Sequence, residues 1–301
     1  MKKVAIIGGG PAGLTAGIYL ARAGVAAVIF ERLAPGGQMN LTAEIDNYPG
    51  LPNISGEELS RRMREQAVAV GVEFKSGVTK LSRAGDEWSV STRRETDTFA
   101  AVIAACGASH RKLDVPGENE FSGRGVSYCA VCDGSFFKGR TVAVQGGGNA
   151  ALEDALYLAQ ICKKVWLIHR RDVFRADRIL IDRVFGNKKI EPVLWHSVAR
   201  IEGENTVERI ITESIAGDAS RVFDVAAIFI AVGTKPESGL IKEFCETDEN
   251  DYVISGEDCK TSAAGLFAAG DLRRKQVYQI VTAVADGASA ARSAVNYLEG
   301  V

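Results

Sequence analysis

The sequence predicts an α/β protein of two three-layer domains, the second of which is inserted into the first. Three observations lead to this prediction. A glycine-rich turn between a strand and a helix occurs near the N-terminus and again past residue 140. A further strand and a long helix follow the second unit and are expected to return to the first domain. The chain has 301 residues, which is ample for two domains.

Composition excludes several classes of protein. Hydrophobic residues make up 46% and charged residues 25%, as in ordinary globular proteins. The 36 basic and 38 acidic residues leave a net charge of −2, so we expect no nucleic-acid or membrane partner. The apolar run at 4–7 ends at Gly8 and is too short for a signal peptide, and no stretch approaches about 18 apolar residues. We therefore expect a cytoplasmic protein.

The first domain opens with a βαβ unit. A buried strand at 4–7 leads into the turn at 8–13, which has the G-x-G-x-x-G pattern, and a helix is predicted over 14–23. A second strand at 28–30 ends at Glu31. In such a Rossmann-like turn the first glycine allows the bend, the second lets backbone approach a pyrophosphate, and the third allows close helix packing. The alternative is a purely structural turn. The predicted cofactor contacts are Gly8, Gly10, Pro11, Ala12 and Gly13.

The same unit returns in the second half of the chain. A strand at 141–145 is followed by a G-x-G-x-x-A turn at 146–151, a helix over 152–162, and a strand at 165–168 that ends at His169. One glycine turn is a weak signal, but two in the same strand–turn–helix setting are specific. The predicted contacts to a second dinucleotide are Gly146, Gly148, Asn149 and Ala150.

The two units differ where the ribose of each nucleotide is expected. Glu31 stands 23 positions after Gly8 (31 − 8), and His169, which two arginines follow, stands 23 positions after Gly146 (169 − 146). A carboxylate accepts hydrogen bonds from a free 2′-hydroxyl, whereas guanidinium groups match a 2′-phosphate. FAD in the first domain and NADPH in the second fit this difference. The alternative is a solvated charge run. The predicted phosphate contacts are His169, Arg170 and Arg171.

Turn-rich segments separate the domains. A polar connector spans 110–125, and the second domain is expected to end at 233–236. The other predicted elements are a helix near 57–70, a β-rich meander over 74–105 that ends in a buried strand, strands at 192–195, 207–214 and 227–232, and a strand at 266–269 before the final helix. The predicted domains are an FAD-binding part at 1–112, an NADPH-binding domain at 113–236, and the rest of the FAD-binding domain at 237–301.

The Cys-x-x-Cys pair formed by Cys129 and Cys132 directly precedes the second unit. Such a pair in a cytosolic chain is redox-active or binds a metal. Zinc would need two further ligands at similar spacing, and the three histidines and four other cysteines are scattered. We therefore predict a redox disulfide and no metal. Asp133 is a candidate proton donor or acceptor for thiolate formation.

These motifs together resemble one family. The segments at 129–134, 146–151 and 169–176 resemble the central block of low-molecular-weight thioredoxin reductases. The resemblance covers nearly the whole chain and includes four further segments. These are 8–13, 36–38, 47–50 and 269–271 with Gln279.

The resemblance implies an activity and a set of roles. Electrons would pass from NADPH through FAD and the cysteine pair to thioredoxin, in a homodimer. Cys129 would attack the thioredoxin disulfide, Cys132 would face the flavin, and Asp133 would act as the acid. Arg124 and the turn at 135–137 would lie on the partner surface. Arg175 would join the phosphate clamp, and further FAD contacts would come from Gly37, Gln38, Asn47, Val78, Gly107, Gly270, Asp271 and Gln279.

The expected mechanism includes a domain rotation. The cysteine pair and the nicotinamide site would lie on the inserted domain and would have to reach one flavin in turn. We place the hinges near 112–117 and 234–239.

Two positions depart from the family pattern. Tyr278 stands where an arginine usually precedes the glutamine, and Cys106 stands where threonine is common; we expect Cys106 to be a small buried residue. Other hypotheses stay open. These are a related flavin disulfide reductase with NADH, ferredoxin or another protein disulfide as substrate, a nucleotide-binding redox sensor without turnover, and an NADPH:ferredoxin reductase that would not need the cysteines.

Overall fold

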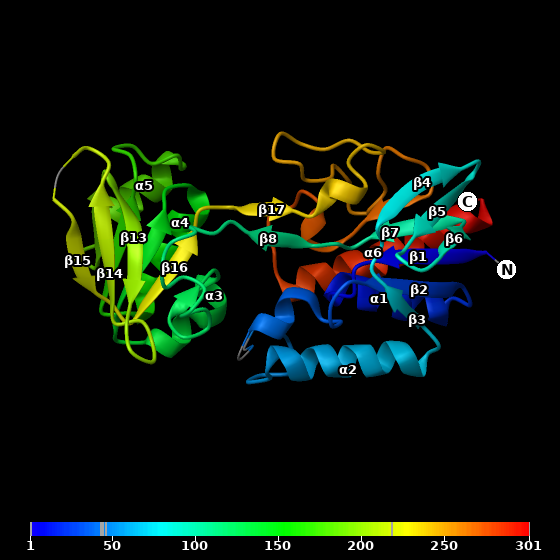
Figure 1. Cartoon of the computed structure of the whole chain (residues 1–301), viewed down its shortest axis with the longest axis horizontal. Helices are drawn as coiled ribbons and strands as arrows, with labels where there is room; N and C mark the ends of the chain where they lie inside the picture. The colour runs from blue at the N-terminus through cyan, green and yellow to red at the C-terminus, as the bar shows by residue number, and fades with distance from the viewer. Residues whose placement is uncertain (1, 43–44, 46, 218, 301) are drawn as a thin grey trace. The chain divides into compact units, whose positions relative to one another are not determined.

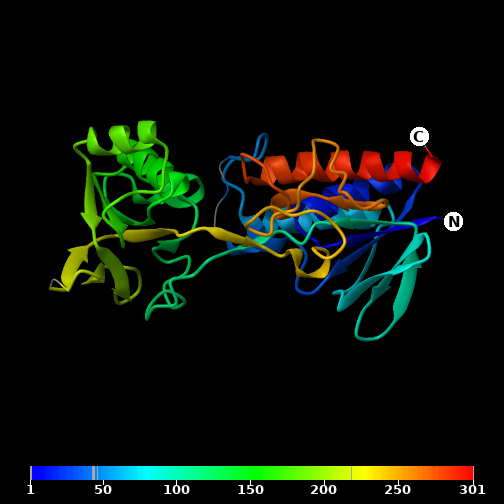
Figure 2. The ribbon, with the colours of Figure 1, turned by 90° about the horizontal axis from the view of Figure 1, so that it is seen from above.

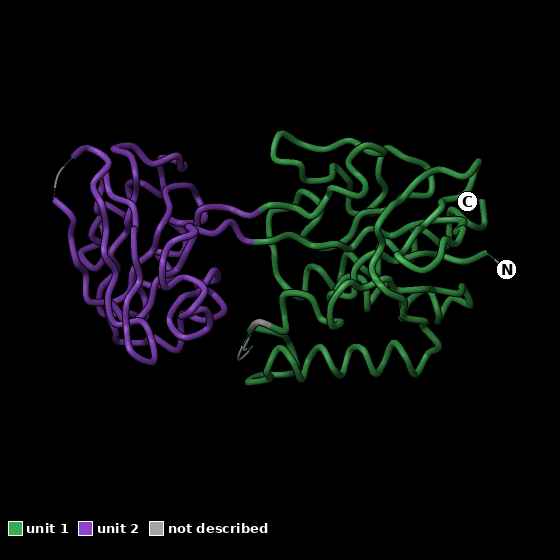
Figure 3. The backbone as a smooth tube through the Cα atoms, viewed as in Figure 1, with its two compact units in different colours: residues 1–109, 235–301 green, residues 110–234 purple. Residues whose placement is uncertain are grey.

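The computed structural model describes residues 2–42, 45, 47–217 and 219–300. The chain divides into two compact units (Figures 1 and 3): residues 1–109 with 235–301 form unit 1, and residues 110–234 form unit 2. Unit 2 is therefore inserted in the sequence of unit 1. Both units are mixed α/β, which confirms the predicted fold class. In the part of the chain that the structure describes, no helix is long and apolar enough to span a membrane.

Unit 1 is built on a parallel five-stranded sheet. Its strands pair in the order β18-β7-β1-β2-β3. The register places Val4 opposite both Ala27 and Ala101, so β1 is central. The strands are β1 (Lys3–Ile7), β2 (Ala26–Glu31), β3 (Glu73–Ser76), β7 (Ala101–Ala104) and β18 (Leu266–Ala268).

Helices cover one face of this sheet. They are α1 (Pro11–Arg22), α2 (Gly56–Ala69) and α6 (Ile280–Glu299). α6 packs along α1 (Figure 2), and their approach is close because a Cβ at Gly287 would stand 2.2 Å from the Ala12 carbonyl oxygen. Ser55 caps α2 by accepting a hydrogen bond from the Glu58 backbone N–H at 3.1 Å. This packing holds the N-terminus of α1, which follows the glycine turn, on the sheet.

The other face of the unit 1 sheet carries an antiparallel meander. It consists of β4 (Lys80–Ala84), β5 (Glu87–Ser91) and β6 (Thr96–Phe99). Trp88, Val90 and Phe99 of the meander pack with Phe30 of the sheet. The short 3₁₀ helices of unit 1 are η1 (Gly37–Leu41), η3 (Ser238–Leu240) and η4 (Gly270–Leu272).

Unit 2 repeats the plan. Its parallel sheet has the order β12-β11-β10-β16-β9, with helices against one face and a three-stranded antiparallel sheet against the other. The parallel strands are β9 (Val126–Ser127), β10 (Thr141–Gly146), β11 (Lys164–His169), β12 (Ile190–Leu194) and β16 (Ala227–Ala231). The other elements are α3 (Ala130–Asp133), η2 (Gly134–Phe137), α4 (Asn149–Ile161), α5 (Arg178–Phe185), β13 (His196–Glu202), β14 (Arg209–Ser214) and β15 (Arg221–Asp224).

The prediction of a meander over 74–105 is wrong in one respect. β3, at its beginning, pairs in parallel with β2 and belongs to the main sheet, because its residue Phe74 packs on the helical face. The strand prediction also missed β13 and β15, and no helix was predicted at α5. β13 and β15 are fixed by pairing with β14, and α5 is fixed by packing against α4 and β12; the pattern within each segment does not contain these contacts.

The two chain crossings between the units lie side by side. β8 (Ala108–His110) and β17 (Thr234–Pro236) pair as a two-stranded ribbon. The segment just after β8 is held inside unit 2 by the buried carboxylate of Glu118. This carboxylate accepts the backbone N–H groups of Leu113 at 3.0 Å and Asp114 at 2.7 Å, and the hydroxyl of Tyr128 at 2.8 Å.

Candidate functional site

The glycine turn of unit 1 is tight at two positions and open at a third. A Cβ at Gly8, whose φ is +111°, would stand 2.2 Å from the Ala105 carbonyl oxygen. A Cβ at Gly13 would stand 1.9 Å from the Gly8 carbonyl oxygen. Among the described residues, none apart from its chain neighbours has an atom within 4 Å of the ideal Cβ position of Gly10, the N-cap of α1. The open cradle at Gly10, beside the free N–H groups of α1, fits a dinucleotide pyrophosphate.

Several of the other predicted cofactor residues of unit 1 gather around this turn. A Cβ at Gly37 would lie 3.3 Å from the Gly10 Cα, and a Cβ at Gly270 would lie 3.0 Å from the Ala12 Cβ. The Gln38 side-chain amide donates a hydrogen bond to the Ala108 carbonyl, close to Gly107 in sequence. Val78 packs against the hydrophobic cluster on the face of the unit 1 sheet that carries the meander.

The Glu31 carboxylate, at the end of β2, packs against the same glycine turn. Its Oε2 accepts the Gly9 backbone N–H at 2.6 Å, and its Oε1 accepts the Leu33 N–H at 2.9 Å. The carboxylate predicted to bind a ribose hydroxyl therefore also supports the turn itself.

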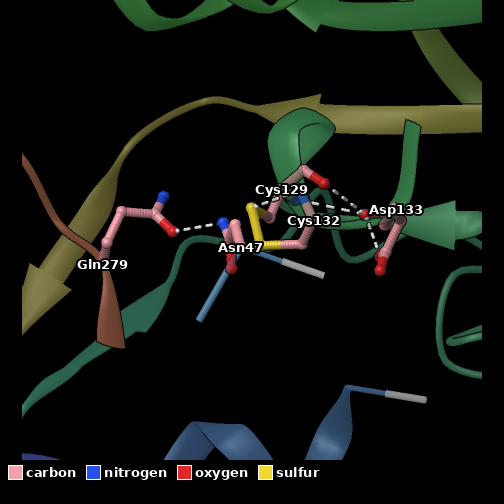
Figure 4. Close-up of a disulfide and its surroundings, with 6 residues drawn as sticks. Asn47, Cys129, Cys132, Asp133 and Gln279 are labelled. Carbon is pink, nitrogen blue, oxygen red and sulfur yellow. Dashed lines mark hydrogen bonds between the residues drawn. A yellow bond between two sulfur atoms is a disulfide. The ribbon is translucent and has the colours of Figure 1, made fainter. Parts of the chain in front are cut away.

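Two residues that are predicted to contact the flavin form a hydrogen bond with each other. The Asn47 side-chain amide donates to Gln279 Oε1 at 3.0 Å (Figure 4). Gln279 is the N-cap of α6 and forms a capping box with Thr282. Asn47 and Gln279 are thus brought together although 232 positions separate them.

Asp271 is joined to a charge cluster that the sequence did not reveal. Lys275 Nζ lies 3.1 Å from Asp271 Oδ1 and 3.1 Å from Asp286 Oδ2. Arg273 pairs with Asp286 at 2.7 Å, and the Gly270 N–H donates to the same carboxylate at 3.0 Å. The side chains of Lys275 and Asp286 are only 7% exposed, so this network fixes the turn that carries Asp271.

The second glycine turn has the same form. A Cβ at Gly146 would stand 2.4 Å from the Ala231 carbonyl oxygen, and a Cβ at Gly147 would overlap the His169 ring at 2.1 Å. Apart from its neighbours in the chain, the described residue with an atom within 4 Å of the ideal Cβ position of Gly148 is Arg175, whose carbonyl oxygen lies at 3.8 Å. Gly148 therefore leaves a cradle at the N-terminus of α4 that fits a second pyrophosphate.

Asn149 is engaged within the chain. Its amide donates to Asp177 Oδ2 at 2.9 Å and its oxygen accepts the Asp177 N–H at 2.8 Å. Ala150 is the next residue of α4, so its backbone lies in the first turn of the helix. Asn149 thus braces the loop after β11 against the turn.

The loop that carries the arginines is tied to the turn and to β12. The Arg175 N–H donates to the Gly147 carbonyl at 2.7 Å, and the Trp195 N–H donates to the Arg171 carbonyl at 3.4 Å. Arg170 and Arg175 are exposed and Arg171 is half-buried. Backbone hydrogen bonds hold this loop, and guanidinium groups are the kind of side chain that could bind an anion here.

His169 does not share this exposure. Its ring is buried, stacks on Phe174 at 5.1 Å, and lies 3.1 Å from the Val173 carbonyl oxygen through Nε2. Burial lowers the pKa of His169, and the nearby arginines lower it further. His169 is therefore placed as neutral support for the turn rather than as a cation on the surface.

Cys129 and Cys132 form a disulfide at the start of α3, with Cα atoms 5.3 Å apart (Figure 4). Both cysteines are half-buried, and the Cys132 N–H donates to Cys129 Sγ at 3.2 Å. A hydrogen bond from a backbone N–H favours a thiolate on Cys129 once the disulfide opens.

Asp133 lies beside the disulfide and is held by Ser127. The Ser127 hydroxyl donates to Asp133 Oδ2 at 2.6 Å and accepts the Cys129 N–H at 3.1 Å. Burial raises the pKa of Asp133 above its ordinary value, although the Ser127 hydrogen bond opposes this change. A carboxyl group that holds its proton more tightly than usual can give it to a nearby thiolate.

The four other cysteines are free. Burial raises the pKa of Cys106, Cys245 and Cys259 to about 12, 11 and 12, and raises that of Cys162. Thiols with raised pKa values form little thiolate near neutral pH. Cys106, expected to be buried, is half-buried. Among the described residues, no group of three or more potential ligands is placed to hold a metal ion.

Comparison with known proteins agrees with this arrangement. The family model of pyridine nucleotide-disulphide oxidoreductases matches residues 2–287. A thioredoxin reductase of Bacillus subtilis is 43% identical over 300 residues, which is 98% of this chain and 94% of that protein. The chain belongs to the thioredoxin reductases, within the pyridine nucleotide-disulphide oxidoreductases. Members of this family are enzymes that use a flavin and a pyridine nucleotide.

Solved thioredoxin reductases resemble this family member in structure. The Streptococcus pyogenes enzyme matches with a TM-score of 0.93 and 43% identity, over 100% of this chain and 99% of that one. The Lactococcus lactis thioredoxin reductase, described as an FR conformation, matches with a TM-score of 0.71 and 40% identity over the full length of both chains.

Sequence reasoning missed several residues of this thioredoxin reductase site. Ser127, Lys275 and Asp286 gave no signal, because each acts through a partner that folding brings near. Trp195, predicted as the end of a strand, lies just past β12, where its N–H reaches the Arg171 carbonyl. The turn at 135–137, expected on the partner surface, is divided: Phe136 is 48% exposed, whereas Phe137 packs on Phe229.

Proposed function

We propose that this protein is an NADPH-dependent thioredoxin-disulfide reductase that uses FAD. The observation that carries the proposal is the Cys129–Cys132 disulfide with Asp133 beside it, on the same unit as a glycine turn flanked by exposed arginines. The name and the high identity of the Bacillus subtilis relative support thioredoxin as the substrate.

The chain's own residues account for the thiol chemistry. A bound flavin would supply the two-electron carrier between the pyridine nucleotide and the disulfide. When the Cys129–Cys132 bond accepts two electrons and opens, Asp133 is placed to protonate one sulfur, and the Cys132 N–H favours the thiolate on Cys129.

The thiolate then reduces the partner. Cys129 attacks one sulfur of the thioredoxin disulfide, that bond breaks, and its other sulfur leaves as a thiolate that takes up a proton. Cys132 next attacks Cys129 in the mixed disulfide. The Cys129–Cys132 bond forms again, the bond between Cys129 and the thioredoxin sulfur breaks, and that sulfur takes up a proton, so thioredoxin leaves as a dithiol.

The two turns would hold different nucleotides. In unit 1, Gly10 and Glu31 would receive the pyrophosphate and the free ribose of FAD. The residues gathered there would contact the rest of the cofactor: Gly8, Pro11, Ala12, Gly13, Gly37, Gln38, Asn47, Val78, Gly107, Gly270, Asp271 and Gln279. In unit 2, Gly146, Gly148 and Ala150 would receive the NADPH pyrophosphate. Arg170, Arg171 and Arg175 would hold its 2′-phosphate.

The proposal includes a homodimer and a rotation of unit 2 between the two half-reactions. Glu118 ties Leu113 and Asp114 to unit 2, so we place the hinge in the β8–β17 ribbon rather than at 112–117. Locking the units by a cross-link would leave one half-reaction fast and stop the other. Survival of both would contradict the rotation.

An anaerobic titration of the purified yellow protein tests the electron donor. Flavin absorbance at its visible maximum is followed while NADPH or NADH is added. We expect bleaching by stoichiometric NADPH and only by a large excess of NADH. Equal bleaching by both would contradict the arginine clamp, and bleaching by neither would move the donor elsewhere, with Tyr278 as the first residue to examine.

A further inference from the structure

Trp195 has a backbone conformation that a tryptophan rarely adopts. It follows β12 directly and has a φ of +61°, in the left-handed region. Of the five non-glycine residues with positive φ in the described chain, three are asparagine or aspartate, which tolerate this region. A bulky side chain does not tolerate this region, so asparagine or aspartate would adopt the backbone conformation of Trp195 at a lower cost in free energy.

The backbone of Trp195 joins the arginine loop to the edge of the second sheet. Its N–H donates to the Arg171 carbonyl at 3.4 Å, and its carbonyl accepts the Ile215 N–H at 2.7 Å. The parallel ladder also sets Leu194 opposite His169. Trp195 therefore stands at the carboxyl end of β12, next to the carboxyl end of β11, where Rossmann-like folds bind their ligand.

The indole is left partly in solvent. Trp195 is 41% exposed, whereas its neighbour His196 is buried, with Nδ1 2.8 Å from the Leu194 carbonyl oxygen. Both backbone bonds of Trp195 could be made by any residue, and asparagine would make them with less strain. The backbone geometry therefore does not require tryptophan, and the exposed part of its indole is available to a ligand.

We infer that the Trp195 indole is the platform on which the adenine ring of the 2′-phosphorylated nucleotide stacks. This inference rests on the proposed function. The base and the 2′-phosphate of an adenosine are attached to neighbouring ribose carbons, so a group that holds the base must lie beside the group that holds the phosphate. Trp195 is one backbone hydrogen bond from Arg171. An exposed aromatic face is the surface on which a base stacks most favourably.

Two substitutions in the FAD-loaded protein test the inference, with 2′,5′-ADP as the probe and calorimetry as the measurement. This probe carries the adenine and the 2′-phosphate but no nicotinamide. Trp195→Asn removes the indole and keeps a residue that suits the backbone conformation, so we expect the dissociation constant to rise about tenfold. Trp195→Tyr keeps an aromatic face and should stay within about threefold of the wild-type protein.

Val222→Ala is the matched control, because Val222 is an exposed apolar residue of β15, in the same unit, and should bind the probe as the wild-type protein does. Unchanged affinity in Trp195→Asn would overturn the inference and leave the proposed function standing. An equal loss of affinity in Trp195→Tyr, which keeps an aromatic face, would also overturn it. Failure of the wild-type protein to bind 2′,5′-ADP would instead refute NADPH as the donor, and the inference with it.

Discussion

The two glycine turns of this molecule both join a parallel strand to a helix, and they differ in the side chain that packs against the turn. In unit 1 the Glu31 carboxylate accepts the Gly9 N–H at 2.6 Å, and in unit 2 the neutral His169 ring covers Gly147. The two residues hold equivalent places, each supporting the middle of its turn. The positive charge that distinguishes unit 2 comes from the exposed arginines that follow. The comparison teaches that one position supports the turn in both units, while the charge that differs between the units stands beside it.

Unit 2 also carries the disulfide, which gives the largest expected difference between the units. Cys132→Ser removes the thiol that resolves the mixed disulfide, so thioredoxin reduction should fall by at least about 1,000-fold. Flavin bleaching by NADPH should survive, because it depends on the two nucleotide turns. Steady-state turnover and anaerobic titration measure the two activities separately. Full turnover in this variant would favour a reductase that does not need the cysteines.

The arginine loop is the next expected difference. Arg170→Ala with Arg171→Ala should raise the KM for NADPH by about 100-fold, because two charge-assisted hydrogen bonds to the 2′-phosphate are lost. The KM for NADH, which lacks that phosphate, should change little. Arg178→Ala is the control, since Arg178 is an exposed arginine of α5 that pairs with Asp182. An equal effect on both nucleotides would contradict the assignment.

The glycines separate folding from binding within one turn. Gly8→Ala forces a Cβ against the Ala105 carbonyl at a φ of +111° and should lower the free energy of unfolding by about 3 kcal/mol or more. In the described part of the chain, the methyl group added by Gly10→Ala would have no residue other than its chain neighbours within 4 Å, so the polypeptide should stay folded while FAD affinity falls about tenfold. Chemical denaturation and flavin release measure the two effects. Normal FAD binding by Gly10→Ala would show that the cradle is not used.

Ser127 gives the smallest expected effect. Removal of its hydroxyl in Ser127→Ala takes away the bond that lowers the pKa of Asp133, so that pKa should rise further. The inflection in the rate of exchange between reduced enzyme and thioredoxin should move to higher pH, with less than about a tenfold change in the maximal rate. Rapid-mixing measurements across pH test this. An unmoved profile would remove Asp133 from the proton transfer.

The raised pKa of Asp133 also has a consequence for stability. The folded state binds this proton more tightly than the unfolded chain, whose ordinary value is 3.8. The stabilisation is complete below that value and is lost as the pH rises through the folded pKa. Asp133→Asn should therefore flatten the dependence of unfolding free energy on pH in this window.

The sequence by itself determined the parts whose cause is local. The glycine turns, the strands that enter them and the helices that leave them follow from residues close together in the chain, and so does the spacing that lets Cys129 and Cys132 join. The insertion of one unit into the other followed from the order of these parts.

Only the tertiary structure decided which side chains face inward and which distant groups meet. It buried His169 on Phe174 while leaving Arg170 exposed, although the two are neighbours in sequence. It joined Lys275 to Asp286, and it set Trp195 beside Arg171. The physical reason is that burial and charge pairing depend on what packs against a segment from elsewhere in the chain, and no local pattern contains that information.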